Sequence, residues 1–419
     1  MHDFPPPGLF MSAGFPFPFP TTYAPVPPGA PSSPLNPSFA LTASAGGPPA
    51  SARLWDLPRA PTWGQPLFHP SDDPKKKDGL AAFAWESDGE HVWTAGERGK
   101  VVRWQPALGA GEAPVQLPTK RRVTDLAVVH GDQALLALCD DGSLLRWNIA
   151  ARRLDFSPAP VQAIPPGGAS LVLSGERASF WLVYREAGVL QKFSVQTGEK
   201  MGDKVQLEPY LSAVAFSADG KWLASACNLF DPLRAKVVLR SAQTFEVVKE
   251  WEHGGSILAL LFTPDNARLI TAGEDRLAQT WDLQTGKLFA APLLHDSSVL
   301  GMTLSPDGRI LATGCLNGPI RLWDLGSGRS IGPGLFPGHT VRRLAFRPDG
   351  SVLMFASERD GAALCVPVPQ PVEGTVERLR AWIESVTGME LAGNEIVQPL
   401  TMPALTERRA RLRDLGGAP

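Results

Sequence analysis

The segment HDSSVLGMTLSPDGRILATGCLNGPIRLWDLGSGRSIGPGLFPGH, residues 295–339, holds the pattern that decides the fold. Apolar and polar residues alternate before the turn SPDGR (305–309), and two further apolar runs, ILATGC and IRLW, follow it. Alternation bounded by Gly, Asp and Pro predicts β-strands, and an Asp-Gly between two such runs predicts a hairpin. The segment is therefore expected to form short antiparallel strands.

The same pattern returns from about residue 80 to residue 368. A residue of the polar turn stands 16 positions before the aromatic residue that ends a later strand. Such pairs are Asp88 and Trp104, Asp265 and Trp281, and Asp307 and Trp323. Repeats of about 44 residues with four short strands are typical of β-propeller blades, which must stack on their neighbours to bury both faces. The sequence predicts an all-β, seven-bladed β-propeller over residues 39–370.

Closure of this ring needs one more strand. The last unit ends at PQPVEG (369–374) without a clear fourth strand. Upstream, residues 38–70 look like the last three strands of a further repeat, and GQPLFHP (64–70) is expected to supply the missing outer strand. Seven blades with some leftover strand is the preferred interpretation, and eight blades with an incomplete first blade is the alternative. A start in mid-repeat also suggests a piece of a longer array.

The units resemble tryptophan-aspartate (WD) repeats, whose signature pairs a Gly-His with a later Trp-Asp. His253 precedes Trp281 by 28 residues, and His295 precedes Trp323 by 28 residues. The resemblance implies a side-chain hydrogen-bond network in each of these two units. Its members would be His253, Thr271, Asp275 and Trp281 in one unit, and His295, Thr313, Asn317 and Trp323 in the next.

The resemblance covers about four fifths of the chain, but several units depart from the signature. Arg240 and Val366 stand where a Trp is expected, so those blades should rely on packing more than on the polar network. The C-terminal tail is similar to the ends of bacterial WD-repeat arrays, some of which are fused to Ser/Thr protein kinases. The resemblance thus implies a bacterial protein connected to a Ser/Thr kinase pathway, although the sequence holds no kinase motif.

Both ends of the chain differ from the repeats. Residues 1–38 are rich in proline and contain no Lys or Arg. They are expected to form a disordered leader, with a ligand for a proline-recognising domain as the alternative. In the tail, residues 371–419, apolar side chains recur at helical spacing from Val376 to Val386, and residues 403–417 hold a second helical pattern. A basic docking helix and an amphipathic helix packed on the propeller both remain open.

Motifs that carry chemistry are scarce. The formal net charge of −2 argues against a nucleic-acid or anionic-membrane surface. The sequence contains no apolar run long enough to span a membrane, no phosphate-binding loop and no Cys/His metal spacing. No catalytic residue, cofactor or metal is therefore predicted. The cysteines are expected to be buried thiols in a reducing compartment, which predicts a cytoplasmic protein. They are Cys139, Cys227, Cys315 and Cys365.

The innermost strands would line a central channel, and Asp125 is the only acid within them, without a partner in the matching positions of other units. A channel lined mainly by apolar and small residues is expected, which favours a structural core over a catalytic centre. An enzyme or small-molecule sensor that uses the channel is the alternative, and converging carboxylates or histidines would favour it. A decayed fragment of a kinase-linked sensor is a third interpretation.

One loop departs from the regular spacing. CNLFDPLRAK (227–236) makes its unit 5 residues longer than the norm and carries Leu229, Phe230 and Leu233. In WD-repeat propellers this loop lies on the face most used for partners, and exposed apolar residues tend to mark interaction sites. These residues are predicted to contact a partner, with folding of Phe230 onto its own blade as the alternative. The predicted function is a non-enzymatic protein–protein interaction scaffold.

Overall fold

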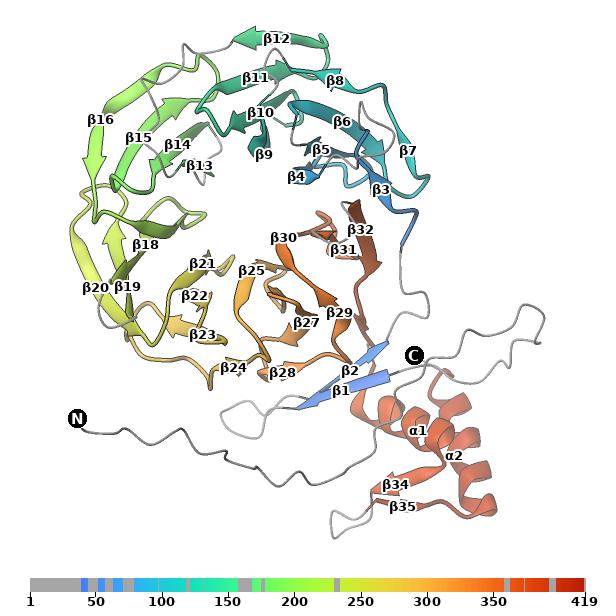
Figure 1. The fold of residues 1–419 in the computed structure, drawn as a ribbon. Helices are drawn as coiled ribbons and strands as arrows, with labels where there is room; N and C mark the ends of the chain where they lie inside the picture. The colour runs from blue at the N-terminus through green and yellow to red at the C-terminus, as the bar shows by residue number, and fades with distance from the viewer. Residues whose placement is uncertain are drawn as a thin grey trace, which may run out of the picture. The chain divides into compact units, whose positions relative to one another are not determined.

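The computed structural model of the protein describes most of the chain after residue 38. The described residues are 39–43, 52–56, 63–70, 79–96, 98–117, 121–129, 131–156, 168–174, 178–229, 234–357, 362–372, 374–391 and 397–417. Seven antiparallel sheets of four or five strands surround a central axis (Figure 1). The predicted seven-bladed propeller is confirmed, and the proline-rich leader, 1–38, lies outside the described residues.

Each blade runs from an innermost to an outermost strand. In blade order, the innermost strands are β4 (Leu80–Trp85), β9 (Val123–Val129), β13 (Ala169–Leu173), β17 (Leu211–Phe216), β21 (Ile257–Phe262), β25 (Val299–Leu304) and β30 (Val341–Phe346). The second strands are β5 (Val92–Gly96), β10 (Ala134–Cys139), β14 (Ser179–Tyr184), β18 (Trp222–Leu229), β22 (Arg268–Gly273), β26 (Ile310–Cys315) and β31 (Val352–Ser357).

The outer half of each blade is more varied. The third strands are β6 (Lys100–Gln105), β11 (Leu144–Asn148), β15 (Val189–Ser194), β19 (Arg234–Ser241), β23 (Leu277–Asp282), β27 (Gly318–Asp324) and β32 (Ala362–Pro367). The outermost strands are β7 (Ala110–Gly111) with β8 (Val115–Gln116), β12 (Arg153–Phe156), β16 (Lys200–Gln206), β20 (Val247–His253), β24 (Leu293–Leu294), β28 (Arg329–Ser330) with β29 (Leu335–His339), and β3 (Leu67–Phe68).

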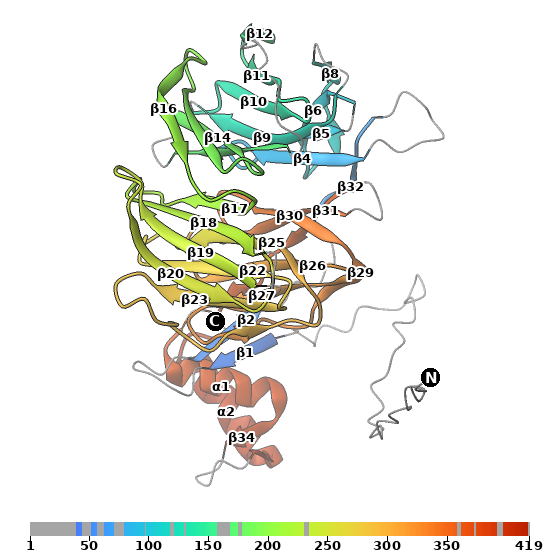
Figure 2. The same cartoon turned by 60° about the vertical axis from the view of Figure 1, so that its left-hand side comes forward.

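The second strands form the core because a blade is covered on both faces by its neighbours (Figure 2). Every residue of β10, β14 and β26 is buried, and their sequences ALLALC, SFWLVY and ILATGC are almost entirely apolar or small. A strand buried on both faces does not alternate, which explains why the pattern is clearer in the first strand than in the second. Packing between blades therefore supplies most of the apolar burial.

The Asp-Gly turns join the first two strands of a blade. In blade 6 the Asp307 carboxylate accepts hydrogen bonds from the Ser305 hydroxyl at 2.5 Å and from the Arg309 N–H at 3.0 Å. Gly308 adopts a φ of 71°, a left-handed conformation that Gly reaches without strain. This local hydrogen bonding explains why the turn recurs with little change from blade to blade.

The ring closes as the sequence predicts. β3, from the upstream segment, pairs antiparallel with β32 of blade 7, with Leu67 opposite Ala363. Leu67 is 1% exposed and packs among apolar side chains of blades 7 and 1, including Met354 and Val92. On the turn face, the Arg347 Nε of blade 7 donates to the Gly89 carbonyl of blade 1 at 2.6 Å.

Two further upstream strands do not build an eighth blade. β1 (Phe39–Ala43) and β2 (Ala52–Asp56) form a three-stranded sheet with β33 (Gln370–Pro371). Trp55 of β2 is fully buried and belongs to the apolar cluster that includes Ile320 of blade 6 and Val366 of blade 7. The expectation of leftover strand beside seven blades is confirmed, and the eight-bladed alternative is wrong.

The tail contains the two predicted helices. α1 (Val376–Thr387) starts at the N-cap Thr375 and ends at Gly388, whose φ is 67°. β34 (Met389–Leu391) and β35 (Val397–Pro399) form a hairpin that leads to α2 (Met402–Asp414). α1 and α2 lie side by side (Figures 1 and 2). Val376, placed on the apolar stripe from the sequence, is 83% exposed because it is the first helical residue. Neither described helix is long and apolar enough to cross a membrane.

Candidate functional site

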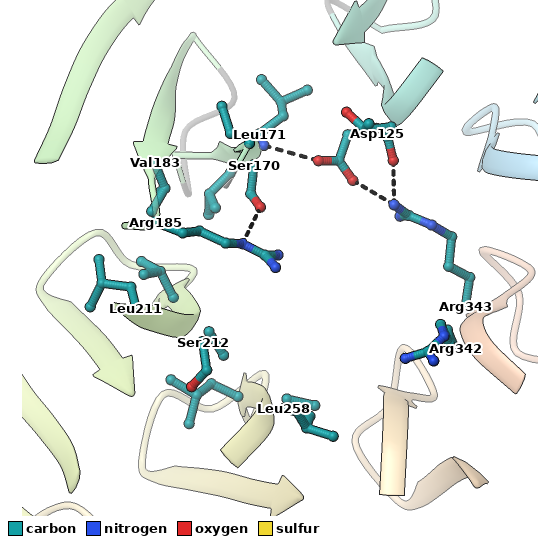
Figure 3. A pocket seen from close by; sticks show the side chains of 18 of the residues that line it. Asp125, Ser170, Leu171, Val183, Arg185, Leu211, Ser212, Leu258, Arg342 and Arg343 are labelled. Carbon is teal, nitrogen blue, oxygen red and sulfur yellow. Dashed lines mark hydrogen bonds and ion pairs between the residues drawn. The ribbon is translucent and has the colours of Figure 1, made fainter. Parts of the chain in front are cut away.

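The N-terminal ends of the innermost strands surround a cavity of about 640 Å³ at one mouth of the central channel (Figure 3). The same end of each blade carries the loops between its second and third strands, because neighbouring strands are antiparallel. Residues from all seven innermost strands line the cavity. We call this region the channel mouth.

A β-bulge turns side chains into the channel mouth. The pairing between first and second strands shifts register near the start of the innermost strand in every blade but blade 3. A residue left between the shifted pairs is unpaired, and the bulge re-aims its side chain. In five blades a single residue lies between the shifted pairs and lines the cavity: Ala81, Thr124, Ser212, Leu258 and Leu300.

Arginine gives the channel mouth a basic character. Arg342 and Arg343 lie in the bulge of β30, Arg122 directly precedes β9, and Arg185 directly follows β14. All four side chains are exposed. Most of the other described lining residues are apolar or small, in agreement with the expectation from the sequence, which did not foresee the arginines at this mouth. The reason is positional: a strand end reaches water, so charges are tolerated there although the strand centre is packed.

Asp125 is the only carboxylate among the described residues that line the cavity, and it is already paired. Its Oδ1 accepts from Arg343 Nη2 at 2.9 Å, and its Oδ2 accepts from the Leu171 N–H at 3.2 Å. Arg343 also donates to the Thr124 carbonyl. As expected, no second carboxylate lies beside Asp125 in the described lining; its partner is instead Arg343, which reaches it from blade 7 across the channel mouth. The group links blades 2, 3 and 7.

The structure brings the four residues of the first WD network together. Thr271 Oγ1 lies 2.9 Å from His253 Nε2 and accepts from Trp281 Nε1 at 3.0 Å. His253 Nδ1 lies 3.2 Å from Asp275 Oδ2. His253 ends the outermost strand of blade 4, whereas Thr271 and Trp281 lie on the second and third strands of blade 5. The network therefore joins two neighbouring blades, and it does not line the channel mouth.

Blades 5 and 6 repeat this arrangement with one difference. His295 follows β24 of blade 5, and its partners lie on the second and third strands of blade 6. His295 Nε2 lies 2.9 Å from Thr313 Oγ1, which accepts from Trp323 Nε1 at 3.1 Å. His295 Nδ1 faces the Leu293 carbonyl at 3.0 Å, which fixes it as the N–H donor. Asn317 instead accepts from the Thr340 hydroxyl at 2.8 Å, so the described contacts do not place it on His295. Asn317 has a backbone φ of 51°, and its side chain points towards Thr340, just before the first strand of blade 7.

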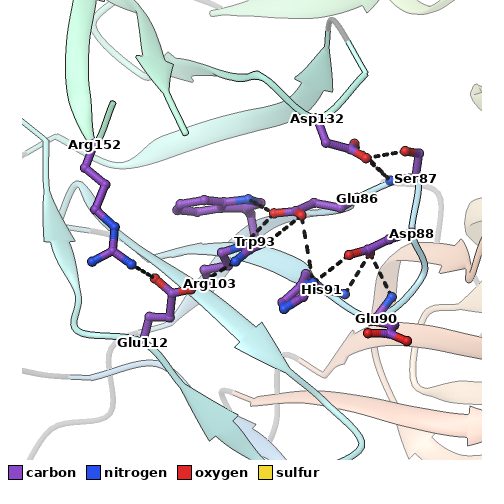
Figure 4. A network of polar contacts seen from close by, with 10 residues as sticks. All are labelled: Glu86, Ser87, Asp88, Glu90, His91, Trp93, Arg103, Glu112, Asp132 and Arg152. Atoms are coloured by element: carbon purple, nitrogen blue, oxygen red, sulfur yellow. Dashed lines mark hydrogen bonds and ion pairs between the residues drawn. The ribbon is translucent and has the colours of Figure 1, made fainter. Parts of the chain in front are cut away.

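Blade 1 carries a polar network of a different kind (Figure 4). The Glu86 carboxylate, 3% exposed, accepts from Trp93 Nε1 at 2.7 Å and from Arg103 Nε and Nη2 at 2.7 and 2.6 Å. These hydrogen bonds hold the pKa of the Arg103 guanidinium above its usual value. Glu86, Asp88 and His91 offer atoms close enough to share a metal ion. Because Arg103 already neutralises Glu86, the geometry supports a structural ion pair.

The tip of the predicted partner loop, residues 230–233, lies outside the described residues. Phe230 and Leu233 lie in the undescribed stretch 230–233, and Leu229 is the last residue of β18. Their contact with a partner stays a prediction. β18 and β19 are each eight residues long, so the strands themselves take up part of the extra length of this unit.

Two stretches of the chain, residues 245–282 and 292–324, match the family model described as "WD domain, G-beta repeat". They contain the two histidine networks of blades 4 to 6. The chain is also 26% identical over 134 residues to an Arabidopsis thaliana protein named U3 small nucleolar RNA-associated protein 18 homolog. That alignment covers 32% of this chain and 22% of the relative's length. Repeat sequence and propeller fold together support a WD-repeat protein.

Proposed function

We propose that the protein is a non-enzymatic scaffold that binds partner proteins over the channel mouth. The observation that carries this proposal is the cavity of about 640 Å³, which exposed arginines and apolar side chains line together. Rigid blades hold these side chains in fixed positions, which reduces the entropy that binding costs. WD-type propellers generally bind proteins, and the WD-type matches therefore support the proposal.

The cavity volume also suits a small molecule, so a sensor is the second candidate. The chemistry of the lining favours a scaffold over an enzyme. General acid–base catalysis needs a titratable group that is placed to exchange protons with a substrate. The only described lining carboxylate, Asp125, accepts from Arg343 and Leu171 instead. Native mass spectrometry of the purified protein tests the sensor, because a retained small molecule would favour it over the scaffold.

We propose that the partner is a protein rather than RNA. The name of the Arabidopsis relative associates that protein with a small nucleolar RNA. Single-stranded RNA is commonly held by aromatic side chains that stack on bases, and the described cavity lining contains none. The net charge of −2 supports the same conclusion. The bacterial source and the link to a Ser/Thr kinase pathway stay predictions.

We also propose a cytoplasmic location. Cys139, Cys227, Cys315 and Cys365 are all free and buried. Burial raises the pKa of Cys139 and of Cys365 to about 12, which keeps these thiols protonated and unreactive. Unpaired cysteines are typical of proteins from reducing compartments.

A photo-crosslinking amino acid at position 212 should capture a partner when the full chain is expressed in its own cells. Ser212 lines the cavity at one end of β17, and a partner seated on the channel mouth would lie within reach. Ala218 is the matched control, because it is exposed just beyond the opposite end of β17. We expect a discrete cross-linked band from position 212 and none from position 218. Equal labelling at both positions, or none at either, would contradict the proposed function.

A further inference from the structure

The channel mouth is chemically divided into two halves. Its arginines come from blades 2, 3 and 7, which follow one another around the ring with only blade 1 between blades 7 and 2. The facing half, from blades 4, 5 and 6, contributes Ser212, Leu258 and Leu300 through the bulges of β17, β21 and β25. A ligand that fills the cavity therefore meets positive charge on one side and aliphatic surface on the other (Figure 3).

Two arginines of the basic half have no carboxylate partner among the described residues. Arg343 is paired with Asp125, but the Nε of Arg185 donates to the hydroxyl of Ser170 at 2.8 Å, which is neutral. This bond fixes the direction of the Arg185 side chain into the cavity (Figure 3). Arg122, beside β9, forms no described ion pair. Positive charges gathered without counter-charge attract an anionic ligand.

The chemistry of the two halves identifies the class of ligand. Guanidinium groups bind carboxylates through paired hydrogen bonds, and leucine side chains accept an aliphatic neighbour. A membrane surface could not enter a cavity enclosed by seven blades, and the described lining lacks aromatic side chains to stack RNA bases. We propose that the channel mouth captures a short acidic segment of the partner protein, whose carboxylates bind Arg122 and Arg185 and whose aliphatic side chain packs against Leu258 and Leu300. This inference rests on the proposed function and specifies its partner.

Arg343 has a different role from Arg122 and Arg185. Because it spans from blade 7 to Asp125 of blade 2, its charge is already used to hold the channel mouth together. Asp125 in turn leaves positive charge in the basic half, since its described contacts reach Arg343 and neither Arg122 nor Arg185. Arg122 and Arg185 are therefore the residues to change in a test, because neither maintains a described ion pair that supports the fold.

Fluorescence anisotropy with labelled peptides tests the inference on the full chain. The first probe is a hexapeptide that alternates pairs of glutamates with leucine, and the second replaces each glutamate by glutamine. We expect the glutamate peptide to bind and the glutamine peptide not to bind. The affinity should fall as NaCl is raised, because the arginines are exposed and their interactions are screened. A uridine oligonucleotide is the third probe, and tighter binding of it than of the glutamate peptide would overturn the inference.

The double variant Arg122→Gln and Arg185→Gln should weaken binding of the glutamate peptide by about tenfold, since each exposed charge pair contributes a few-fold. The matched control, Lys221→Gln with Arg309→Gln, also removes two positive charges. Both lie beside the Asp-Gly turns at the other end of their blades, and their side chains are 69% and 53% exposed. Melting curves equal to wild type should show that both variants fold.

Three results would overturn the acidic-segment inference: no binding of the glutamate peptide, equal binding by wild type and the arginine variant, or equal weakening in the control. The photo-crosslinking experiment separates this failure from failure of the proposed function. If position 212 still captures a partner in the arginine variant, the proposed scaffold function stands and the acidic-segment inference is rejected. If position 212 captures no partner when both arginines are present, the proposed scaffold function itself is rejected.

Discussion

The Leu67→Ala substitution should lower the free energy of unfolding by about 2–5 kcal/mol, the range observed when a buried leucine is truncated in a packed core. Leu67 is 1% exposed and packs where blade 7 meets blade 1. Leu67 belongs to β3, the upstream strand that completes blade 7. Truncation of its side chain therefore weakens the contact between blades 7 and 1 that closes the ring. Urea unfolding followed by tryptophan fluorescence measures the change.

Phe68→Ala provides a control within the same strand. Phe68 pairs with Ala362 in the same ladder, but its side chain points the other way and is 51% exposed. Because the backbone pairing is kept and little apolar surface is buried, the cost should stay below about 1 kcal/mol. Equal losses in the two variants would mean that the side chain of Leu67 does not stabilise this contact, and the predicted closure would then depend on backbone pairing alone.

The repeat made the architecture predictable from the sequence. The distance from turn to aromatic is set by the length of two strands and a hairpin, so a blade is recognisable even where the Trp is replaced, as at Arg240, although the distance from Asp219 to Arg240 is 21 rather than 16 residues. The structure retains the blade there because Arg240 donates to the Ser225 hydroxyl at 2.9 Å and pairs with Glu208. Closure of the ring by residues 64–70 was also predictable from the repeat. The last unit lacked a fourth strand, and the segment upstream of the first unit had the pattern of such a strand.

The channel mouth was less accessible to sequence reasoning. Arg342 and Arg343 are visible in the sequence VRRLAF (341–346). In a regular strand, however, successive side chains point in opposite directions, so only one of these two arginines would point towards the axis. The bulge in β30 breaks that alternation, and the sequence pattern did not predict the bulge. Arg122 and Arg185 lie just outside their strands, so the alternation within a strand could not place them at the channel mouth. The pairing of Asp125 with Arg343, 218 residues away, depends on ring geometry.

Acidification should destabilise the protein through His295, which follows the outermost strand of blade 5 and contacts Thr313 of blade 6. Burial, the main cause, lowers the pKa of His295 from 6.5 to about 4, and the charge of Arg321 acts in the same direction. Hydrogen bonds to the Leu293 and Arg276 backbone and the charge of Asp296 oppose it. The folded protein therefore resists the proton that the unfolded chain accepts. Stability from the neutral histidine is fully present above pH 6.5 and is lost as the pH falls towards 4.

The His295→Gln variant isolates this contribution, because the other histidines titrate equally in both proteins. At pH 7.5 the variant should be the less stable protein, since it changes a side chain that contacts Thr313 at 2.9 Å. By pH 4.5 the stability gap should have moved by about 2–3 kcal/mol in favour of the variant, because wild type alone loses the neutral histidine. Asp296, whose pKa Arg321 lowers from 3.8, titrates below this window and does not contribute. Urea unfolding of both proteins at steps of pH measures the gap. A gap that stays constant from pH 7.5 to 4.5 would show that His295 accepts a proton as readily in the folded blade as in the unfolded chain.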